Sequence, residues 1–499
     1  MTTLTSQIPP ETLAAFNGDE LRARVFWEKY ALRGSDGQAV ETTPQQMWDR
    51  VAREIASVEP TPELRETWRR EFRWLLDGFR FIPGGRILHG AGNPSKVTLL
   101  NCYYLDIHDD SLEAIYDTAS RMARTYSRGG GVGIDISILR PRGAPVRNAA
   151  RYSTGAVSFM ELFSTTTGLI GQHGRRGALM ITIADYHPDV LDFCRIKRNL
   201  TSVRYANISV RVSDAFMRAV QADATWRLHY QSREAGLIER LIPARELWSE
   251  IVLGARDWAE PGLLYWDRVL GWGTSNYGGM TPKGTNPCSE IPLEPGGACN
   301  LGSIALHRFV SDPFTTRARL DTNGLKKAVR VAVRFLDNVL TYNEGRHPLP
   351  EQEEASRRSR RIGLGITGLG DMLLMLGLRY DSDEAIQLAG QLQETIKLAA
   401  YQASVELARE KGPFPAFDAD RHLAQPFFST FPEQLLEDIR KSGLRNVCLL
   451  TIPPVGSGSA LAGCSNGLEP VFALYYLRRS ESLSREHFRV LHPAVAEYA

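Results

Sequence analysis

Two of the chain's six cysteines stand close together in GTNPCSEIPLEPGGACNLGS, residues 284–303. Cys288 sits in a turn rich in proline and glycine, between Asn286 and Glu290, and Cys299 follows eleven positions later. In an extended loop, residues i, i+2 and i+4 share one face, so Asn286, Cys288 and Glu290 can address one ligand. A free thiol in such a loop is either an inert core residue or a reactive group.

The composition limits the cellular compartments and the kinds of binding partner that can be expected. Six cysteines in 499 residues, with no CxxC and no Cys/His cluster of zinc spacing, are too few for a secreted disulfide framework. This predicts a reducing compartment, the cytoplasm, and no metal-binding residues. A net charge of +2 indicates neither nucleic acid nor membrane as a partner. There is no apolar run of ~20 residues and no signal-peptide pattern at the N-terminus.

The apolar pattern predicts a helical N-terminal region, 1–80, followed by one α/β domain, 81–499. The first region contains the amphipathic segments LRARVFWEKYAL and QMWDRVAREIASV. Further on, the branched apolar runs ALMITIADY, VRYANISVRV and NVCLLTIPP alternate with helical stretches, which is typical of α/β units. Two helices stand out, 325–344 and 383–411, the second capped by Ser382 or Asp383 and stopped by Gly412-Pro413.

Three glycine-rich stretches could hold phosphate. GLGITG, 363–368, fits GxGxxG, but the polar run EQEEASRRSRR precedes it where a strand would be required, so we favour close packing there. SRGGGVGIDIS (127–137) and TIPPVGSGSALAGCSNG (451–467) offer several backbone N–H groups. A helix starting after Ser457 would favour a phosphate. On these residues alone, a phosphate site and a structural turn are equally supported.

Five motifs together resemble one family. NPCSEIPL, ACNLGS, SRGGGVGIDIS with LRPRGAPV, RRIGLGITGLGDML, and TIPPVGSGS with AGCSNGLEP and FAL occur in the order seen in ribonucleotide reductase large subunits. The chain most resembles the adenosylcobalamin-dependent class (class II). The resemblance implies reduction of ribonucleoside di- or triphosphates by a thiyl-radical mechanism. It also implies a ten-stranded α/β barrel of two parallel five-stranded halves, with a finger loop inside.

The resemblance assigns the catalytic roles. Cys288 matches the thiyl-radical residue of the finger loop, which suits hydrogen abstraction because S–H and ribose C3′–H bonds are close in strength. Glu290 matches the general base for the 3′-OH proton, and Asn286 a residue that hydrogen-bonds the substrate. Cys102 and Cys299 match the pair that ends as a disulfide. The other cysteines, which match no functional position, are interpreted as small buried hydrophobes: Cys194, Cys448 and Cys464.

The resemblance also assigns binding residues. The substrate diphosphate would lie on the turn formed by Pro454, Val455, Gly456, Ser457 and Gly458, although the family usually has Thr in place of Val455. Asn101 and Gly131 match other substrate contacts, whereas Arg86 stands where a small hydroxyl residue is usual. Deoxynucleoside triphosphate effector positions are matched by Asp110, Ser111 and Arg140, and the loop linking effector to substrate by Arg175 and Arg176.

The same resemblance implies cofactors and partners: adenosylcobalamin, a dNTP effector, a thioredoxin-like reductant and a second copy in a homodimer. The N-terminus lacks the ATP-binding regulatory domain of some relatives. Relatives continue past HPAVAEYA with further strands and a cysteine-rich tail, so a separate C-terminal fragment is a further expected partner and the barrel is expected to be incomplete. Two alternatives stay open: a class I large subunit that receives its radical from a partner, and a nucleotide-binding fragment of a split reductase, inactive alone.

Overall fold

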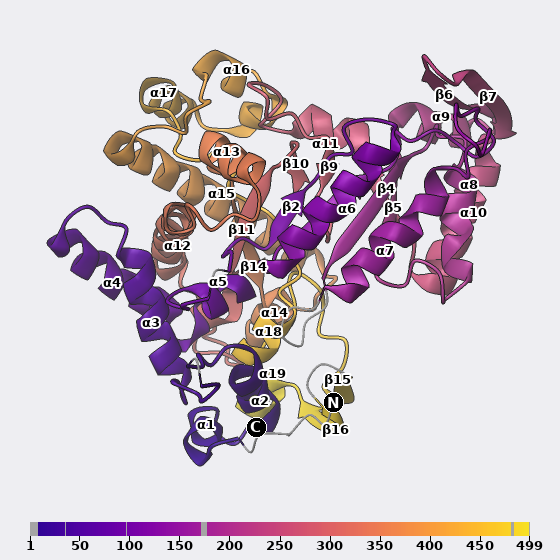
Figure 1. The fold of residues 1–499 in the computed structure, drawn as a ribbon. Coiled ribbons are helices and arrows are strands. Elements are labelled where there is room, and N and C mark those ends of the chain that lie inside the picture. Colours follow the sequence, from indigo (N-terminus) through magenta and orange to yellow (C-terminus); the bar gives the residue numbers. More distant parts are fainter. Residues whose placement is uncertain (1–7, 35, 96, 171–176, 481–483, 499) are drawn as a thin grey trace.

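The computed structural model describes residues 8–34, 36–95, 97–170, 177–480 and 484–498 (Figure 1). The N-terminal region consists of helices α1 (Pro10–Ala15), α2 (Glu20–Lys29), α3 (Pro44–Ala56) and α4 (Pro62–Leu76). Thr43 begins α3 with a capping box, in which its side chain accepts a hydrogen bond from the Gln46 backbone and the Gln46 side chain accepts one in return. The predicted helical region is therefore confirmed.

The main sheet has eight strands over the described residues. Five of them run parallel in the order β2 (Cys102–Tyr104), β3 (Gly131–Asp135), β4 (Leu179–Ala184), β5 (Asn207–Val212) and β8 (Gly262–Tyr265). On the other side of β2 lies β11 (Ala298–Ala305), which pairs antiparallel with β2 and β1 (Phe81–Pro83) and parallel with β14 (Ile362–Thr367). This confirms one parallel five-stranded half, and beyond it β11 and β14 form a parallel pair that runs antiparallel to β2. The described residues do not form a closed ring of ten strands.

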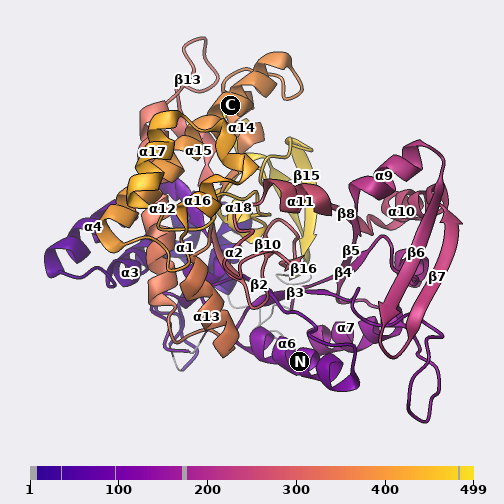
Figure 2. The same ribbon diagram turned by 90° about the horizontal axis from the view of Figure 1, so that it is seen from above.

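The remaining helices alternate with the strands along the chain (Figures 1 and 2). Before β11 in the chain come α5 (Gly85–Gly90), α6 (Leu112–Ser127), α7 (Met160–Leu169), α8 (Val190–Arg195), α9 (Asp214–Gln221), α10 (Ala244–Trp258) and α11 (Trp266–Trp272). Those that follow are α12 (Thr322–Tyr342), α13 (Pro350–Ser359), α14 (Leu369–Met375), α15 (Asp383–Lys411), α16 (Ala419–Leu423), α17 (Glu433–Ser442), α18 (Ser457–Ala462) and α19 (Pro493–Tyr498). The remaining strands form hairpins: β6 (Thr225–Ser232) with β7 (Gly236–Pro243), β9 (Gly284–Thr285) with β10 (Pro292–Leu293), β12 (Val310–Ser311) with β13 (Arg319–Leu320), and β15 (Tyr475–Ser480) with β16 (Ser484–Leu491).

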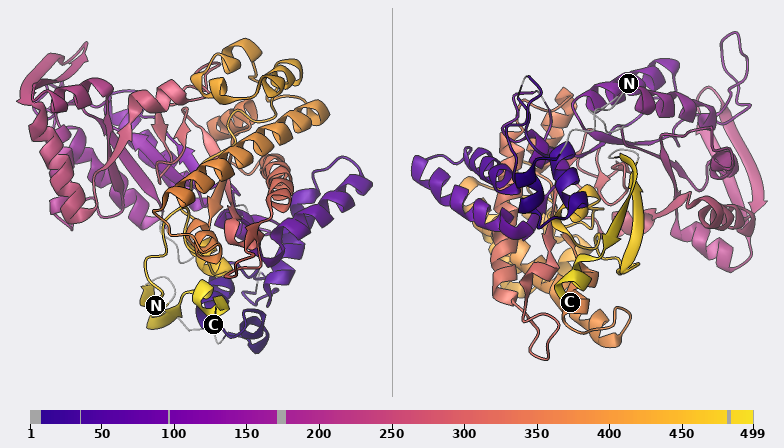
Figure 3. Two further views of the ribbon diagram at one scale, coloured as in Figure 1. Left: turned by 180° about the vertical axis from the view of Figure 1, so that it is seen from behind. Right: turned by 90° about the horizontal axis from the view of Figure 1, so that it is seen from below.

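The two helices singled out in the sequence are confirmed as α12 and α15. The apolar residues that recur every three or four positions along α12 are completely buried or nearly so: Leu325, Val329, Val333, Leu336 and Leu340. This helix packs against β11 and β14 and also contacts α3, α4 and α15. The Ser382 side chain caps α15 by accepting a hydrogen bond from the Ala385 N–H, and the helix ends at Gly412, whose φ of 82° favours glycine. Figure 3 (left) shows α15 crossing the back of the molecule.

The glycine stretch 363–368 is a packing element, as predicted. It forms the buried strand β14, where a Cβ on Gly365 would lie 2.4 Å from Pro453 Cδ. The run NVCLLTIPP was expected to be a strand. In the structure it runs beside β14 through hydrogen bonds to the carbonyls of Cys448 and Leu449 and a bridge at Leu450, without forming a named strand. It ends at two prolines, Pro453-Pro454, which cannot donate to a ladder.

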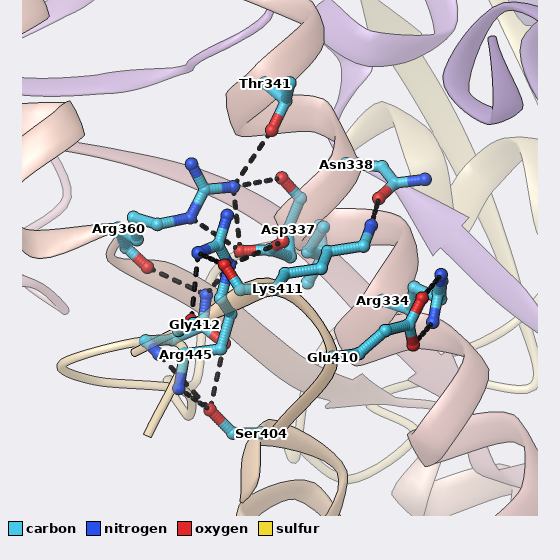
Figure 4. Close-up of polar contacts among 12 residues, drawn as sticks. Arg334, Asp337, Asn338, Thr341, Arg360, Ser404, Glu410, Lys411, Gly412 and Arg445 are labelled. Carbon is cyan, nitrogen blue, oxygen red and sulfur yellow. Dashed lines mark hydrogen bonds and ion pairs between the residues drawn. The ribbon is translucent and has the colours of Figure 1, made fainter. Parts of the chain in front are cut away.

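A network of buried charges holds α12 against its neighbours (Figure 4). Asp337, with a fully buried side chain, accepts hydrogen bonds from Arg360 Nε at 2.9 Å, Asn446 Nδ2 at 3.0 Å and Arg445 Nε at 3.3 Å. Burial alone would raise the pKa of Asp337, but the charges of Arg360 and Arg445 lower it overall.

One turn before Asp337, Arg334 extends the network into the N-terminal region. Its guanidinium bonds Glu59, in the link between α3 and α4, at 2.7 and 2.8 Å, and Glu410 of α15 at 2.6 Å. Glu59 is completely buried and also accepts a hydrogen bond from Lys411 Nζ at 3.1 Å. The helical region and the α/β domain are thus joined by ion pairs as well as by apolar contacts.

Candidate active site

The loop that carries Cys288 is the tip of the hairpin formed by β9 and β10. Its shape is set by backbone hydrogen bonds from Asn286 N to Ile291 O at 3.2 Å and from Ser289 N to Asn286 O at 3.1 Å. The Asn286 side chain adds a third, because its Oδ1 accepts from Ile291 N at 3.0 Å. Ser289 takes a φ of 68°, which turns the chain just past Cys288. We call residues 284–293 the finger loop.

Glycines, which have no side chain, let the finger loop lie directly on the sheet. A Cβ on Gly133 would stand 1.8 Å from Thr285 O, and one on Gly131 would stand 2.8 Å from Pro287 Cγ. Likewise, a Cβ on Gly284 would stand 2.1 Å from the Tyr104 ring. The sequence left the stretch 127–137 open between a phosphate site and a structural role. Gly131 and Gly133 have a packing role, since any side chain there would push the finger loop away.

The predicted thiols come together at this point. Cys102 and Cys299 are direct partners in the antiparallel pairing of β2 with β11, so their side chains share one face of the sheet. Asn286 Nδ2 of the finger loop lies 3.2 Å from Cys102 Sγ and 2.7 Å from Glu290 Oε2. All three cysteines are free thiols. Residues 184 positions apart in the chain therefore meet at one site.

A cavity of about 200 Å³ opens at the tip of the finger loop. Six of its lining residues were predicted from the resemblance: Asn101, Cys102, Gly131, Cys288, Glu290 and Pro454. Six more were not assigned a role from the sequence: Arg86, Gly129, Gly130, Ala178, Pro287 and Leu301. Gly129 and Gly130 belong to the same SRGGGVG run as Gly131. The glycine-rich composition of this run was the sequence signal that could have identified them as lining residues. The Asn101 Oδ1 atom is buried without a hydrogen-bond partner and so can accept one from a ligand.

Burial keeps the acidic groups of this site protonated to higher pH than usual. It raises the pKa of Cys288 to about 12, with a further contribution from the charge of Glu290, although the thiol itself is open to the cavity. Burial also raises the pKa of Glu290, while the hydrogen bond from Asn286 opposes the rise. Glu290 Oε1 is buried and has no partner. The site therefore presents a neutral S–H group beside a carboxyl group with one open oxygen.

The proposed phosphate turn is only partly directed at the cavity. Pro454 lines it, but the N–H groups of Val455 and Gly456 donate to Asn466 Oδ1 at 2.8 and 3.1 Å. The Ser457 hydroxyl lies 2.6 Å from Tyr30 OH. Helix α18 does begin at Ser457, as the sequence suggested. A phosphate on this turn would have to replace these internal partners.

The predicted effector residues form a separate cluster. Arg140 Nε bonds Asp110 Oδ2 at 2.6 Å, and Arg140 also bonds Glu234 Oε2 at 3.0 Å. The Tyr230 hydroxyl donates to Asp110 at 2.8 Å. Ser111 caps α6 by accepting a hydrogen bond from Ala114 N, and this helix begins at Leu112. Arg175 and Arg176 lie outside the described residues.

The interpretation of Cys448 as an inert hydrophobe is wrong. Its side chain is partly exposed, and its sulfur lies 2.9 Å from Arg361 Nη1 and 3.0 Å from Thr274 Oγ1. Cys194, by contrast, is buried as predicted, whereas Cys464 is partly exposed, so the interpretation as a small buried hydrophobe is wrong there as well. The partners of Cys448 are far away in the chain, which is why its local sequence context did not reveal them.

The pairing of Cys102 with Cys299 leads to a first prediction. Directly opposed residues of antiparallel strands have Cα atoms about 4.5–5.5 Å apart, within the range of about 4.4–6.8 Å that a disulfide needs. Mild oxidation should therefore link these two thiols without unfolding the chain, as peptide mapping by mass spectrometry would show. Buried Cys194 should remain free as an internal control. A dominant link between any other pair would contradict the assignment.

No three or more His, Cys, Asp or Glu side chains in the described part of the chain are placed to hold a metal ion. Among the helices of that part, none has the length and apolarity that crossing a bilayer requires.

Comparison with known proteins gives consistent matches along the chain. Residues 16–96 match the family model described as ribonucleotide reductase, all-alpha domain, and residues 100–497 match the one described as ribonucleotide reductase, barrel domain. A vitamin B12-dependent ribonucleoside-diphosphate reductase of Mycobacterium tuberculosis (strain CDC 1551 / Oshkosh) is 37% identical over 463 residues, which are 91% of this chain and 62% of the relative. The protein of the same name from Thermoplasma acidophilum is 32% identical over 516 residues, 91% of this chain and 63% of the relative.

A ribonucleoside-diphosphate reductase large subunit of vaccinia virus (strain Copenhagen) is 30% identical over 512 residues, 93% of this chain and 63% of the relative. The chain thus spans somewhat less than two thirds of the length of these curated relatives. Since the barrel-domain model covers most of the chain and the all-alpha model precedes it, the chain belongs to the ribonucleotide reductase large-subunit family.

Proposed function

We propose that this chain carries the catalytic site of a cobalamin-dependent ribonucleotide reductase, which converts ribonucleoside diphosphates into 2′-deoxyribonucleoside diphosphates. The observation that carries the proposal is the meeting of Cys288, Glu290 and Cys102 at one cavity, with Cys299 paired to Cys102 across the sheet. The names of the similar M. tuberculosis and T. acidophilum proteins favour a diphosphate substrate and the B12-dependent class. The reaction would follow the thiyl-radical mechanism that the resemblance implies.

In this proposal each residue has one task. The Cys288 sulfur, as a thiyl radical, takes the 3′ hydrogen atom of the ribose, and Glu290 accepts the 3′-OH proton. The 2′-OH then leaves as water. Cys102 and Cys299 supply two electrons and two protons and become a disulfide, and Cys288 returns the hydrogen atom to C3′. The unpartnered Oε1 of Glu290 and Oδ1 of Asn101 are the acceptors available to substrate hydroxyl groups.

The site fits adenosylcobalamin in a limited way. When bound, this cofactor supplies a carbon-centred radical that can take a hydrogen atom from a thiol. The Cys288 side chain is exposed and reachable from outside, and its pKa of about 12 keeps it in the S–H form that such a transfer needs. A cavity of about 200 Å³ is too small to enclose the corrin ring.

The proposal also covers regulation and partners. A dNTP effector would bind at the cluster of Asp110, Ser111 and Arg140, with Arg140 at the phosphates. The exposed face of α6 carries Leu112 and Tyr116, 51% and 60% exposed, and would pack on a second copy in a homodimer. A thioredoxin-like dithiol in the cytoplasm would reduce the disulfide.

A split reductase is the second candidate. The chain spans less than two thirds of the length of its relatives, and it has an open sheet edge and an exposed apolar surface. Strand β8 ends the main sheet, and large apolar side chains of residues 472–491 are exposed: Phe472, Leu474, Tyr475, Leu477 and Leu491. A second chain that continues the barrel could cover them.

The test is a deoxynucleotide assay with a ribonucleoside diphosphate, adenosylcobalamin and dithiothreitol, with and without a separately made C-terminal fragment. Product from the chain alone would support the first form of the proposal, and product only with the fragment would support the split form. Absence of product in both, together with no binding of ribonucleoside diphosphate, would refute it.

Replacing Arg140 with alanine should abolish the influence of added dNTPs on substrate choice. The change removes the only cation of the Asp110–Arg140–Glu234 cluster, so a triphosphate would meet two carboxylates. Effector-free turnover should persist. Relative rates on several ribonucleotides, each measured with different dNTPs, provide the readout. Arg142→Ala is the matched control, since this neighbouring arginine is largely exposed. Unchanged substrate selection in Arg140→Ala would exclude the assigned role.

A further inference from the structure

A buried ion pair lies on the far side of the cysteine pair from the cavity. Arg361, just before β14, is 3% exposed and bonds Glu294 Oε2 through Nη2 at 2.9 Å. Glu294 is completely buried, and the Ser275 hydroxyl lies 3.3 Å from the same Nη2 atom. The proposed mechanism gives no task to this guanidinium, although burying it removes a full charge from water.

The sheet register places Arg361 beside Cys299. β11 and β14 pair with Asn300 opposite Ile362, so Cys299 and Arg361 precede that pair on neighbouring strands. Cys299 Sγ lies 3.1 Å from the point where a Cβ on Gly363 would stand, which puts the sulfur on the face of the sheet to which Gly363 belongs. Residues two apart in an extended strand project to the same face. Arg361 therefore shares this face with the Cys299 sulfur.

The two thiols of the pair have different surroundings. Burial raises the pKa of both; at Cys299 the charge of Arg361 opposes the rise, while Glu290, Cys448 and Glu294 add to it. At Cys102 the nearby Glu290 adds to the rise, and Asn286 is the group that opposes it. Access differs as well, because Cys102 lines the cavity and Cys299 is not among its lining residues. The sulfur that lines the cavity is thus the one farther from the cation.

A third thiol shares the same guanidinium. Arg361 Nη1 lies 2.9 Å from Cys448 Sγ, while Nη2 is held by Glu294. The guanidinium is therefore fixed in place between Glu294, Cys448 and the sheet face that carries Cys299. Its Nε atom has no hydrogen-bond partner. A planar cation fixed by side chains on several segments is a preorganised electrostatic group.

We infer that Arg361 is a positioning residue for re-reduction of the Cys102–Cys299 disulfide, and that it makes Cys299 the sulfur that leaves as thiolate. This rests on the proposed function of the cysteine pair. A dithiol reductant attacks Cys102 Sγ from the cavity, a new S–S bond forms there, and the electron pair of the broken S–S bond goes to Cys299. The second thiol of the reductant then closes its own disulfide and releases Cys102. In total, two electrons and two protons pass from the dithiol to the chain.

The test starts from the oxidised chain and needs no cobalamin. We expect Arg361→Gln to slow reduction by dithiothreitol by roughly 3- to 30-fold, since a neighbouring charge shifts a thiol pKa by 1–3 units and leaving-group rates follow part of that shift. Arg361→Lys, which keeps the charge, should restore most of the rate. Because Arg361→Gln leaves Glu294 unpaired, the double variant Arg361→Gln/Glu294→Gln is measured beside it.

A second readout separates positioning from a structural role. The oxidised chain is treated with a monothiol, the first released thiol is capped with a maleimide, and both adducts are mapped by mass spectrometry. In the unchanged chain the maleimide should be on Cys299 and the monothiol on Cys102. Both Arg361→Gln variants should give mixed positions. Arg334→Gln is the control, since it removes another buried, ion-paired arginine that contacts Glu59 and Glu410 instead.

The outcomes are distinguishable. Unchanged rates and an unchanged adduct pattern in both Arg361→Gln variants would overturn the inference and leave the proposed function standing. If the unchanged chain forms no Cys102–Cys299 disulfide at all, both the proposed function of the pair and this inference fail.

Discussion

Replacing Cys288 with serine is expected to abolish nucleotide reduction, by roughly 10³-fold or more, as when an essential reacting group is removed from an enzyme. A hydroxyl O–H bond is much stronger than a thiol S–H bond, so serine cannot exchange a hydrogen atom with ribose under mild conditions. The finger loop should keep its shape, because Asn286, Ser289 and Ile291 make the hydrogen bonds that define it.

The measurement is deoxynucleotide formation, together with hydrogen exchange from the 5′ carbon of adenosylcobalamin. Both should be lost in Cys288→Ser, whereas oxidation should still link Cys102 with Cys299. Cys194→Ser is the control, since this cysteine is buried away from the cavity. A Cys288→Ser chain that still exchanged hydrogen would rule this residue out as the radical site.

Removing the Asp337 carboxylate should destabilise the fold by about 3–5 kcal/mol, the cost of breaking a buried ion pair from one side. Alanine at this position would leave Arg360, whose side chain is 7% exposed, and the nearby Arg445 without their shared anion. Thermal and urea unfolding followed by circular dichroism would measure the change. Asp381→Ala is the control, because Asp381 pairs with Arg379 on the surface.

The same group predicts a pH dependence. Because the pKa of Asp337 is lower in the folded chain than its ordinary value of 3.8, its contribution to stability is complete well above that value. It is lost as the pH falls through the lowered folded pKa. Acid should therefore narrow the stability gap between the unchanged chain and Asp337→Ala. A gap that stays constant from neutral pH to below pH ~3 would contradict this linkage.

Local signals in the sequence predicted local structure well. The stripe of α12 and the caps of α15 follow from spacing within one helix, and the close packing of Gly363–Gly368 follows from the polar run before it. The meeting of Cys102 with Cys288 could not be predicted from spacing, because it depends on strand order. Only the resemblance suggested it, and the structure places both residues at one cavity.

Where the sequence analysis erred or fell short, the deciding partner lay elsewhere in the chain. Cys448 was interpreted as a small buried hydrophobe because it matches no functional position of the family, but Arg361, 87 positions away, supplies a cation. The turn at Val455 and Gly456 reads as a phosphate site until Asn466 is seen to occupy its N–H groups. Such partners are chosen by tertiary packing, and no periodicity in the sequence records them.

The glycines under the finger loop have a consequence for how this site can vary. The height of the Cys288 thiol above the sheet is set by the absence of side chains at Gly131 and Gly133, because the loop backbone lies where a Cβ on Gly133 would be and the Pro287 ring lies against the position of one on Gly131. Hydrogen-atom transfer depends steeply on the distance between donor and acceptor. One methyl group at either position would displace the finger loop and change the distance from the Cys288 sulfur to the substrate. These two positions therefore fix the depth at which the reacting sulfur lies.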